Sequence, residues 1–188
     1  AGPVAPPLMF SGCGGSLTHA LRELFWMPAD TVPAADTHDT SVWLPDLQVM
    51  IARESSEACS GLTVAAKGGH NDENHNHNDI GHVVIMLDGQ PAIIDIGVET
   101  YTQQTFSPQR YELWCIRASG HNAPLVNGVE QAPGRERRAT RVEYTADGAV
   151  QWLALNLEEA YPPEADLVSL RRAVTLDASG STSVITAL

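Results

Sequence analysis

From Val42 onward the sequence is a succession of short apolar or alternating runs separated by turn residues, a texture typical of β-strands. Asp88-Gly89 and Asp147-Gly148 each separate two runs, and AspGly is a preferred sequence for a two-residue turn between antiparallel strands. A single open sheet built from these strands would leave one apolar face in water. The sequence therefore predicts an all-β fold, an antiparallel β-sandwich. The runs are SVWLPDLQVMIAR, GLTVAAK, HVVIMLDGQPAIIDIG, RVEYTA, VQWLALNL and SVITAL.

The first 40 residues have a different character. Apolar residues within 17–27 recur at helical spacing, and Pro28 follows to end the helix. Residues 28–41 are rich in Pro, Ala, Asp and Thr without periodicity, as in a linker or an exposed loop. We therefore expect a short helical and linker segment over 1–40 and one main domain over 41–188.

The charge balance excludes some partners. The chain has 23 acidic and 11 basic residues, and a net charge of -12 repels nucleic acid. No apolar run approaches the ~18 residues that a membrane-spanning helix requires, so we expect no membrane span. The only dense basic cluster suits an anionic polysaccharide or, alternatively, a solvated strand edge. It consists of Arg135, Arg137, Arg138 and Arg141.

Histidines are concentrated in one segment. Four of the seven lie in GGHNDENHNHNDIGH, residues 68–82, and His121 follows in SGHNAPLVNG. Imidazole serves both as a metal ligand and as an acid or base near neutral pH. On extended backbone His75 and His77 would share one face with Asp79. The Asp88-Gly89 turn would bring Asp95 to the end of the hairpin that His77 enters.

Two interpretations of this segment stay open at this point. A polar loop rich in Asn and His can simply be solvated. Asp95, however, interrupts an otherwise apolar run, where a carboxylate is costly unless it meets a cation or several donors. The alternative to a solvated loop is therefore that the histidines and Asp95 form a local metal site or ion pair.

A long stretch of the sequence resembles the C-terminal domain of heparinase II/III-like proteins. The resemblance rests on KGGHNDENHNHNDIGHVVIMLDGQPAIIDIGVETYT and TFSPQRYELWCIRASGHNAPLVNGVEQ, and it extends over about residues 42–176. It implies a β-sandwich packed against an α/α toroid of the same protein, with a catalytic cleft between them. Residues 1–40 then correspond to the tail of that helical domain.

The resemblance also implies a metal site and its ligands. His77, Asp95 and His121 take the metal positions. Two imidazoles and one carboxylate suit Zn²⁺, or a similar divalent metal, better than Ca²⁺ or Mg²⁺, which prefer oxygen ligands. His82 stands where many members have a small residue, so it either competes as a ligand or covers the site.

The activity that the resemblance implies is β-elimination on acidic polysaccharides or oligosaccharides that contain uronic acid. His75 takes the position of the histidine that faces the cleft, where it would position the uronate carboxylate and share in proton transfer. The principal tyrosine and histidine of the reaction belong to the toroid, so we expect the isolated chain to be inactive.

Tyr101 and Arg110 lie between the two parts of the predicted site and could line the cleft. A guanidinium binds a carboxylate in bidentate fashion, which favours Arg110 as a substrate contact. Tyr101 and Trp114 are alternatively core or interdomain aromatic residues.

The sequence leaves two rival functions open. One is a metal-stabilised carbohydrate-binding or structural module without catalysis, and the other is a metal hydrolase, whose product contains no double bond.

Overall fold

The computed structural model describes residues 38–187 except residues 58, 149 and 178. The expected helix within 17–27 lies outside these residues. The described residues belong to one compact unit. Among the described residues, no helix has the length and apolar character needed to cross a membrane.

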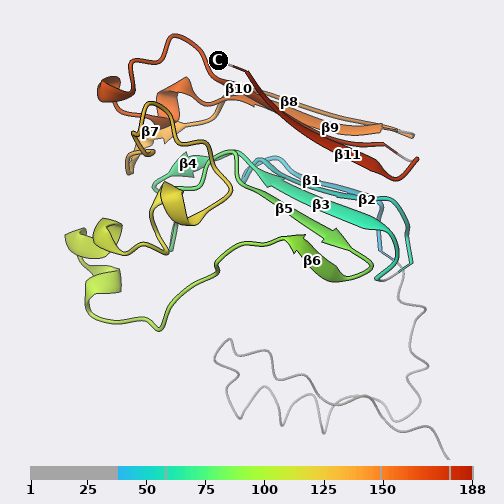
Figure 1. Ribbon diagram of the computed structural model, residues 1–188, viewed down its shortest axis with the longest axis horizontal. Helices are drawn as coiled ribbons and strands as arrows, with labels where there is room; N and C mark the ends of the chain where they lie inside the picture. Colours follow the sequence, from blue (N-terminus) through green and yellow to red (C-terminus); the bar gives the residue numbers. More distant parts are fainter. Residues whose placement is uncertain (1–37, 58, 149, 178, 188) are drawn as a thin grey trace, which may run out of the picture. The chain divides into compact units, whose positions relative to one another are not determined.

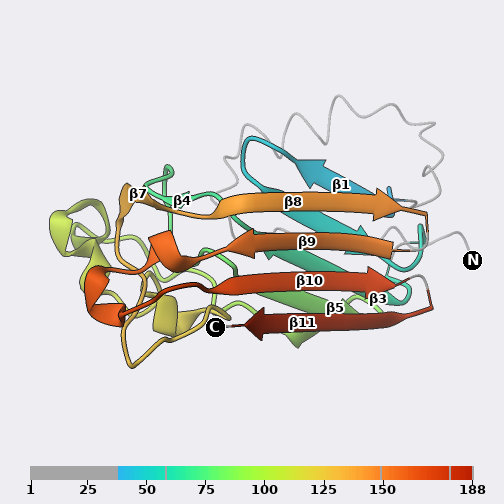
Figure 2. The ribbon, with the colours of Figure 1, turned by 90° about the horizontal axis from the view of Figure 1, so that it is seen from above.

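Two antiparallel sheets are stacked face to face, as Figure 1 shows from the side and Figure 2 from above. This arrangement confirms the predicted all-β sandwich. One sheet has the order β1-β2-β3-β5-β6 and the other β11-β10-β9-β8, while β4 and β7 pair separately. The strands are β1 (Ser41–Leu44), β2 (Val49–Arg53), β3 (Leu62–Lys67), β4 (His70–Asn71), β5 (Val83–Leu87), β6 (Gln90–Ile93), β7 (Gly134–Arg138), β8 (Thr140–Asp147), β9 (Val150–Asn156), β10 (Arg171–Asp177) and β11 (Ser181–Ala187).

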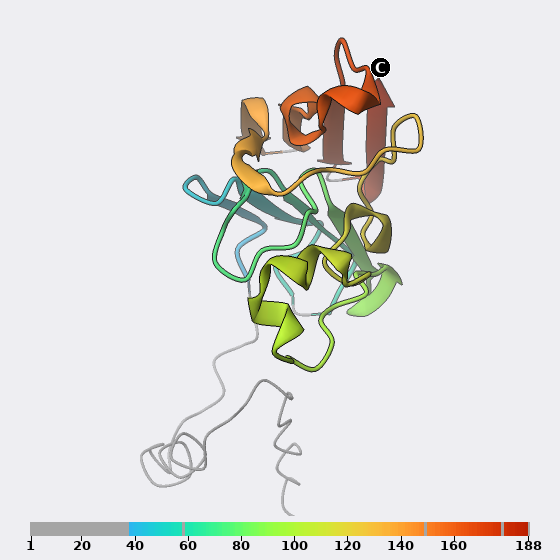
Figure 3. The ribbon, with the colours of Figure 1, turned by 90° about the vertical axis from the view of Figure 1, so that its left-hand side faces the viewer.

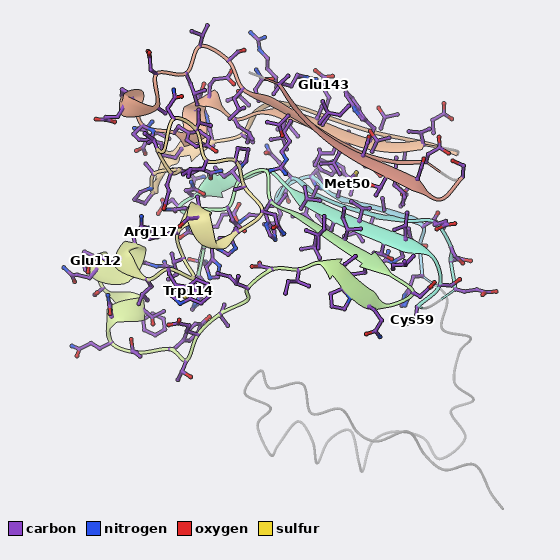
Figure 4. All side chains as sticks on the ribbon, viewed as in Figure 1. Met50, Cys59, Glu112, Trp114, Arg117 and Glu143 are labelled. Carbon is purple, nitrogen blue, oxygen red and sulfur yellow. The ribbon has the colours of Figure 1, made fainter. Side chains whose placement is uncertain are left out.

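Alternating side chains build the core between the sheets. Met50 on β2 is fully buried and points between the two layers (Figure 4). Val64 on β3 and Leu153 on β9 are also fully buried and belong to the same apolar cluster. Burial of one face of each sheet stabilises the sandwich, because removing apolar surface from water is the main favourable contribution to folding.

The two AspGly turns lie where the sequence predicts them. Asp88 and Gly89 both have positive φ, 49° and 72°, as a two-residue hairpin turn of this type requires. Leu87 pairs with Gln90 across this turn. At the other turn, Asp147 at the end of β8 pairs with Val150 at the start of β9.

The structure corrects the predicted extent of one strand. β6 ends at Ile93, whereas the sequence predicted a continuous strand through Asp95. Ile94 and Ile96 are exposed on either side of Asp95. The argument that a buried apolar strand surrounds this carboxylate is therefore wrong, and the position of Asp95 depends on its own polar contacts.

Loops and short 3-10 helices gather at one end of the sandwich. Figure 3 views this end, where the 100–120 segment runs beside the sheets, and Trp114 marks the segment in Figure 4. The short helices are held mainly by local hydrogen bonds. The five 3-10 helices are η1 (Gln104–Phe106), η2 (Pro108–Glu112), η3 (Ala118–Gly120), η4 (Glu158–Ala160) and η5 (Pro163–Ala165).

Candidate metal centre and adjoining pocket

Three polar side chains converge where β5 begins and the chain leaves β6. Asp95 Oδ1 lies 2.9 Å from His121 Nδ1, and Asp95 Oδ2 lies 3.5 Å from His82 Nε2. One ligand atom from each of the three residues lies within 4.8 Å of the other two. Imidazole nitrogens and a carboxylate oxygen at these distances can hold a metal ion.

The contacts of the His121 ring place two hydrogen-bond acceptors opposite each other when the ring is neutral. His121 Nε2 lies 3.0 Å from the carbonyl oxygen of Cys115, which only accepts, so Nε2 donates. In the neutral ring, Nδ1 then directs a lone pair at Asp95 Oδ1, which is also an acceptor. A cation or a second proton between these two atoms relieves this opposition, so the donor set fits a bound metal.

His77 lies beside this group. Its ring centroid is 4.9 Å from that of His121. Burial lowers the pKa of His77, and the neighbouring His121 lowers it further, whereas Asp79 and Asp95 oppose this effect. The neutral form is therefore favoured, and it is the form that binds metals.

The pKa values of His82 and Asp95, whose side chains face each other, are also lowered. Burial lowers the pKa of His82, against the opposing charge of Asp95. Burial alone raises the pKa of Asp95, but a hydrogen bond from the Gly97 N–H and the two neighbouring imidazoles outweigh it and lower the pKa. A neutral imidazole and an ionised carboxylate are the states that a metal site requires.

The sequence-based picture of one extended His75–Asp79 face is not observed. His75 lies in a turn with a φ of 57°, and no strand includes residues 72–82. His75 is exposed, and its ring stacks on Tyr101 at a centroid distance of 5.9 Å. The turn therefore directs His75 to a pocket instead of to the same face as Asp79, which is buried.

The pocket has a volume of about 290 Å³ and joins several of the predicted residues. His75, His77, Tyr101 and Arg110 all line it, together with Phe106, whose ring meets Tyr101 edge to face at 5.4 Å. Tyr101 and Trp114 are 51% and 56% exposed, so neither is a core residue of the described domain.

A comparison with protein-family models identifies the family of this β-sandwich domain. Residues 40–186 match the family model described as Heparinase II/III-like, C-terminal. The chain belongs to this family. The match confirms the resemblance found in the sequence and indicates a domain of a polysaccharide lyase. A search of curated proteins gave no significant match.

Arg110 contributes a positive charge to the pocket of this heparinase II/III-like domain. Its Nη2 donates to the carbonyl oxygen of Asn76 at 2.7 Å, and its Nε is buried without a hydrogen-bond partner. No carboxylate within the described residues lies at salt-bridge distance from it. An uncompensated guanidinium at a pocket is suited to an anionic ligand.

Asn122 holds the strands at the metal-binding group, a role that sequence reasoning missed. Its Nδ2 donates to the carbonyl oxygens of Val83 at 2.9 Å and Ile94 at 2.8 Å. Its backbone N–H donates to His82 Nδ1 at 3.0 Å. The only sequence signal was its position directly after His121, because hydrogen bonds to residues far along the chain are visible only in the fold.

A buried amide fixes the far end of the histidine-rich segment. Gln131 accepts from the Ile80 N–H at 3.0 Å and donates to the Ile80 carbonyl oxygen at 2.7 Å. Asn71 also donates to Gln131, at 3.2 Å. Nearby, Lys67 Nζ lies 2.7 Å from Asp79 Oδ1, so the segment that positions His75 and His77 is anchored at several points.

Proposed function

We propose that this domain forms one wall of the cleft of a polysaccharide lyase that cleaves glycans containing uronic acid by β-elimination. The observation that carries the proposal is the shared pocket, which joins the imidazole of His75, the candidate metal ligand His77 and the guanidinium of Arg110. Among the described residues this guanidinium has no carboxylate partner. An α/α toroid of the same protein would form the opposite wall and supply the principal acid and base.

The proposed ligands of the metal are His77, Asp95 and His121. His121 offers Nδ1, because its Nε2 donates to a carbonyl, and His77 offers a half-buried neutral ring. Two nitrogens and one carboxylate favour zinc and leave a position for water. Bound zinc would supply a fixed positive charge. It would also link the three segments that carry its ligands, namely the histidine-rich segment, the chain after β6 and the end of η3.

The proposed substrate contacts follow from the charges in the pocket. In β-elimination a base removes the C5 proton beside the uronate carboxylate, the electron pair forms the C4–C5 double bond, and the C4–O bond breaks as the leaving oxygen gains a proton. Negative charge builds up on the carboxylate as the proton leaves. Arg110 would bind this carboxylate, and His75 would position it and share in proton transfer.

The positive charge of Arg110 explains how a chain with a negative net charge can bind an anionic substrate. The net charge of -12 disfavours anions at long range, but screening limits that effect to about 10 Å in ordinary salt. Arg137 and Arg138, from the basic cluster of the sequence, each have a carboxylate at salt-bridge distance, Glu136 and Glu159, whereas Arg110 has none among the described residues. Arg110 is therefore the better anion contact.

The test is a product assay on the full-length protein with its toroid. We expect absorbance from an unsaturated uronate to rise with at least one member of a panel of uronic acid polymers. Cleavage that yields reducing ends without this absorbance would favour a metal hydrolase. Binding without any cleavage across the panel would favour a carbohydrate-binding or structural module.

Replacement of Arg110 by methionine should weaken catalysis in the full-length protein. Hydrogen bonds to charged groups contribute about 1.5–3 kcal/mol, so kcat/KM should fall by roughly 10- to 100-fold. Arg53→Met is a matched control, because Arg53 lies on β2 and donates to the Asp39 carbonyl, outside the pocket. An unchanged kcat/KM for Arg110→Met would remove Arg110 from the substrate site.

A further inference from the structure

We propose that His82 is a positioning residue for Asp95 and not a metal ligand, with its Nε2 proton directed at Asp95 Oδ2. This inference rests on the proposed metal site and refines it, since distance alone groups His82 with Asp95 and His121. It assigns the two oxygens of one carboxylate to different partners.

The tautomer of His82 follows from a backbone contact. The Asn122 N–H can only donate, and it lies 3.0 Å from His82 Nδ1. Nδ1 therefore uses its lone pair to accept this hydrogen bond. In the neutral ring the proton is then on Nε2, and no lone pair remains for a metal.

The surroundings of Nε2 agree with a donor that needs an acceptor. His82 Nε2 is buried and has no hydrogen-bond partner of good geometry, and Asp95 Oδ2 at 3.5 Å is the carboxylate oxygen beside it. A small rotation of the carboxylate would complete the hydrogen bond. Turning the ring over instead would present a carbon to the Asn122 N–H and leave that donor unpaired.

His121 and His82 face the same carboxylate with opposite character. In the neutral rings, His121 directs the Nδ1 lone pair at Oδ1, because its Nε2 donates to the Cys115 carbonyl oxygen, whereas His82 directs an N–H at Oδ2. Oδ1 and His121 Nδ1 are thus left for a cation, and the hydrogen bond to Oδ2 holds the carboxylate in place. Partners that orient metal ligands in this way typically change metal affinity by about 10–100-fold when they are removed.

Asn122 couples this arrangement to the sheet. Its side chain bonds to the carbonyls of Val83 and Ile94, the residues next to His82 and Asp95 in the sequence. The same residue therefore sets the proton position on His82 and the separation of the two chain segments that present His82 and Asp95.

The first test measures the tautomer directly in the metal-free 188-residue chain. Long-range ¹H–¹⁵N correlation spectra of histidine-labelled protein, assigned with His82→Gln, should show the Nε2–H form for His82. The Nδ1–H form would overturn the proposal. This measurement needs no metal, so it decides the role of His82 even if the proposed metal site fails.

The second test compares variants for zinc stoichiometry, zinc affinity by chelator competition, and the visible spectrum of the Co²⁺ form. His82→Gln keeps an N–H donor and should retain one equivalent with affinity within about threefold of the native chain. His82→Ala should retain one equivalent with affinity lowered by about 10–100-fold. Both Co²⁺ spectra should match the native spectrum.

His77→Ala provides the matched comparison, because it removes a proposed ligand from the same segment and should lose the bound metal. Loss of zinc or a changed Co²⁺ spectrum in His82→Gln would show that His82 is itself a ligand. A native chain that binds no zinc would refute the proposed metal site, which is a different result from a wrong tautomer.

Discussion

Replacing Asp95 by alanine should release the metal and lower the thermal stability of the chain. The carboxylate lies 2.9 Å from His121 Nδ1, so its loss removes a ligand and leaves two imidazoles. A ligand present at 1,000 times its Kd stabilises the folded state by about 4 kcal/mol, which for a domain of this size is roughly 8–16 °C in Tm. Elemental analysis and thermal unfolding of the purified chain would measure both effects.

A second carboxylate in the histidine-rich segment provides the control. Asp72 is exposed, so Asp72→Ala should retain one equivalent of zinc and the native Tm. His121→Ala should behave like Asp95→Ala. With excess EDTA the native chain should lose most of its advantage over Asp95→Ala, because the difference arises from the metal. A folded native chain without metal would leave the histidines as a polar lining of the pocket.

The fold could be predicted because its determinants are local. Alternating burial on strands such as β2 and the positive φ values of Asp88 and Gly89 are properties of short sequence windows. The predicted runs did not include β10, because its mixed sequence RRAVTLD has weak alternation. Its pairing with β9 and β11 places it in the sheet.

The site could be predicted only in part, because the contacts that build it join distant residues. Asp95 and His121 are 26 positions apart, and the family resemblance paired them before any geometry was known. The burial argument for Asp95 was wrong because a run of apolar residues does not show whether another element covers it. Ile94 and Ile96 are exposed, so apolar character did not imply burial.

Hydrogen-bond direction is a further property that residue types do not reveal. His82 and His121 are chemically identical and both adjoin Asp95, but a backbone N–H faces one ring and a carbonyl oxygen faces the other. These two contacts distinguish a hydrogen-bond donor from a metal ligand. Such a distinction requires the positions of backbone groups from another part of the chain.

Replacing His75 should nearly abolish lyase activity in the full-length protein while leaving the metal in place. The His75 ring lies in the pocket, stacked on Tyr101 and outside the group formed by Asp95 and His121. A positioned acid or base contributes about 10²–10⁴-fold to a rate, so kcat should fall within that range. Steady-state assays on the uronic acid polymer that serves as substrate, with elemental analysis of the same preparations, would test both parts.

The choice of substitution matters because His75 has a φ of 57°. Asparagine tolerates this conformation better than alanine, so His75→Asn removes the imidazole with less backbone strain and should match His75→Ala in activity. His38→Asn, at an exposed residue outside the pocket, should retain full activity. If His75→Asn lost zinc to the same extent as His77→Ala and Asp95→Ala, the separation of ligand and catalytic roles would be wrong, and the turn at His75 would belong to the metal site.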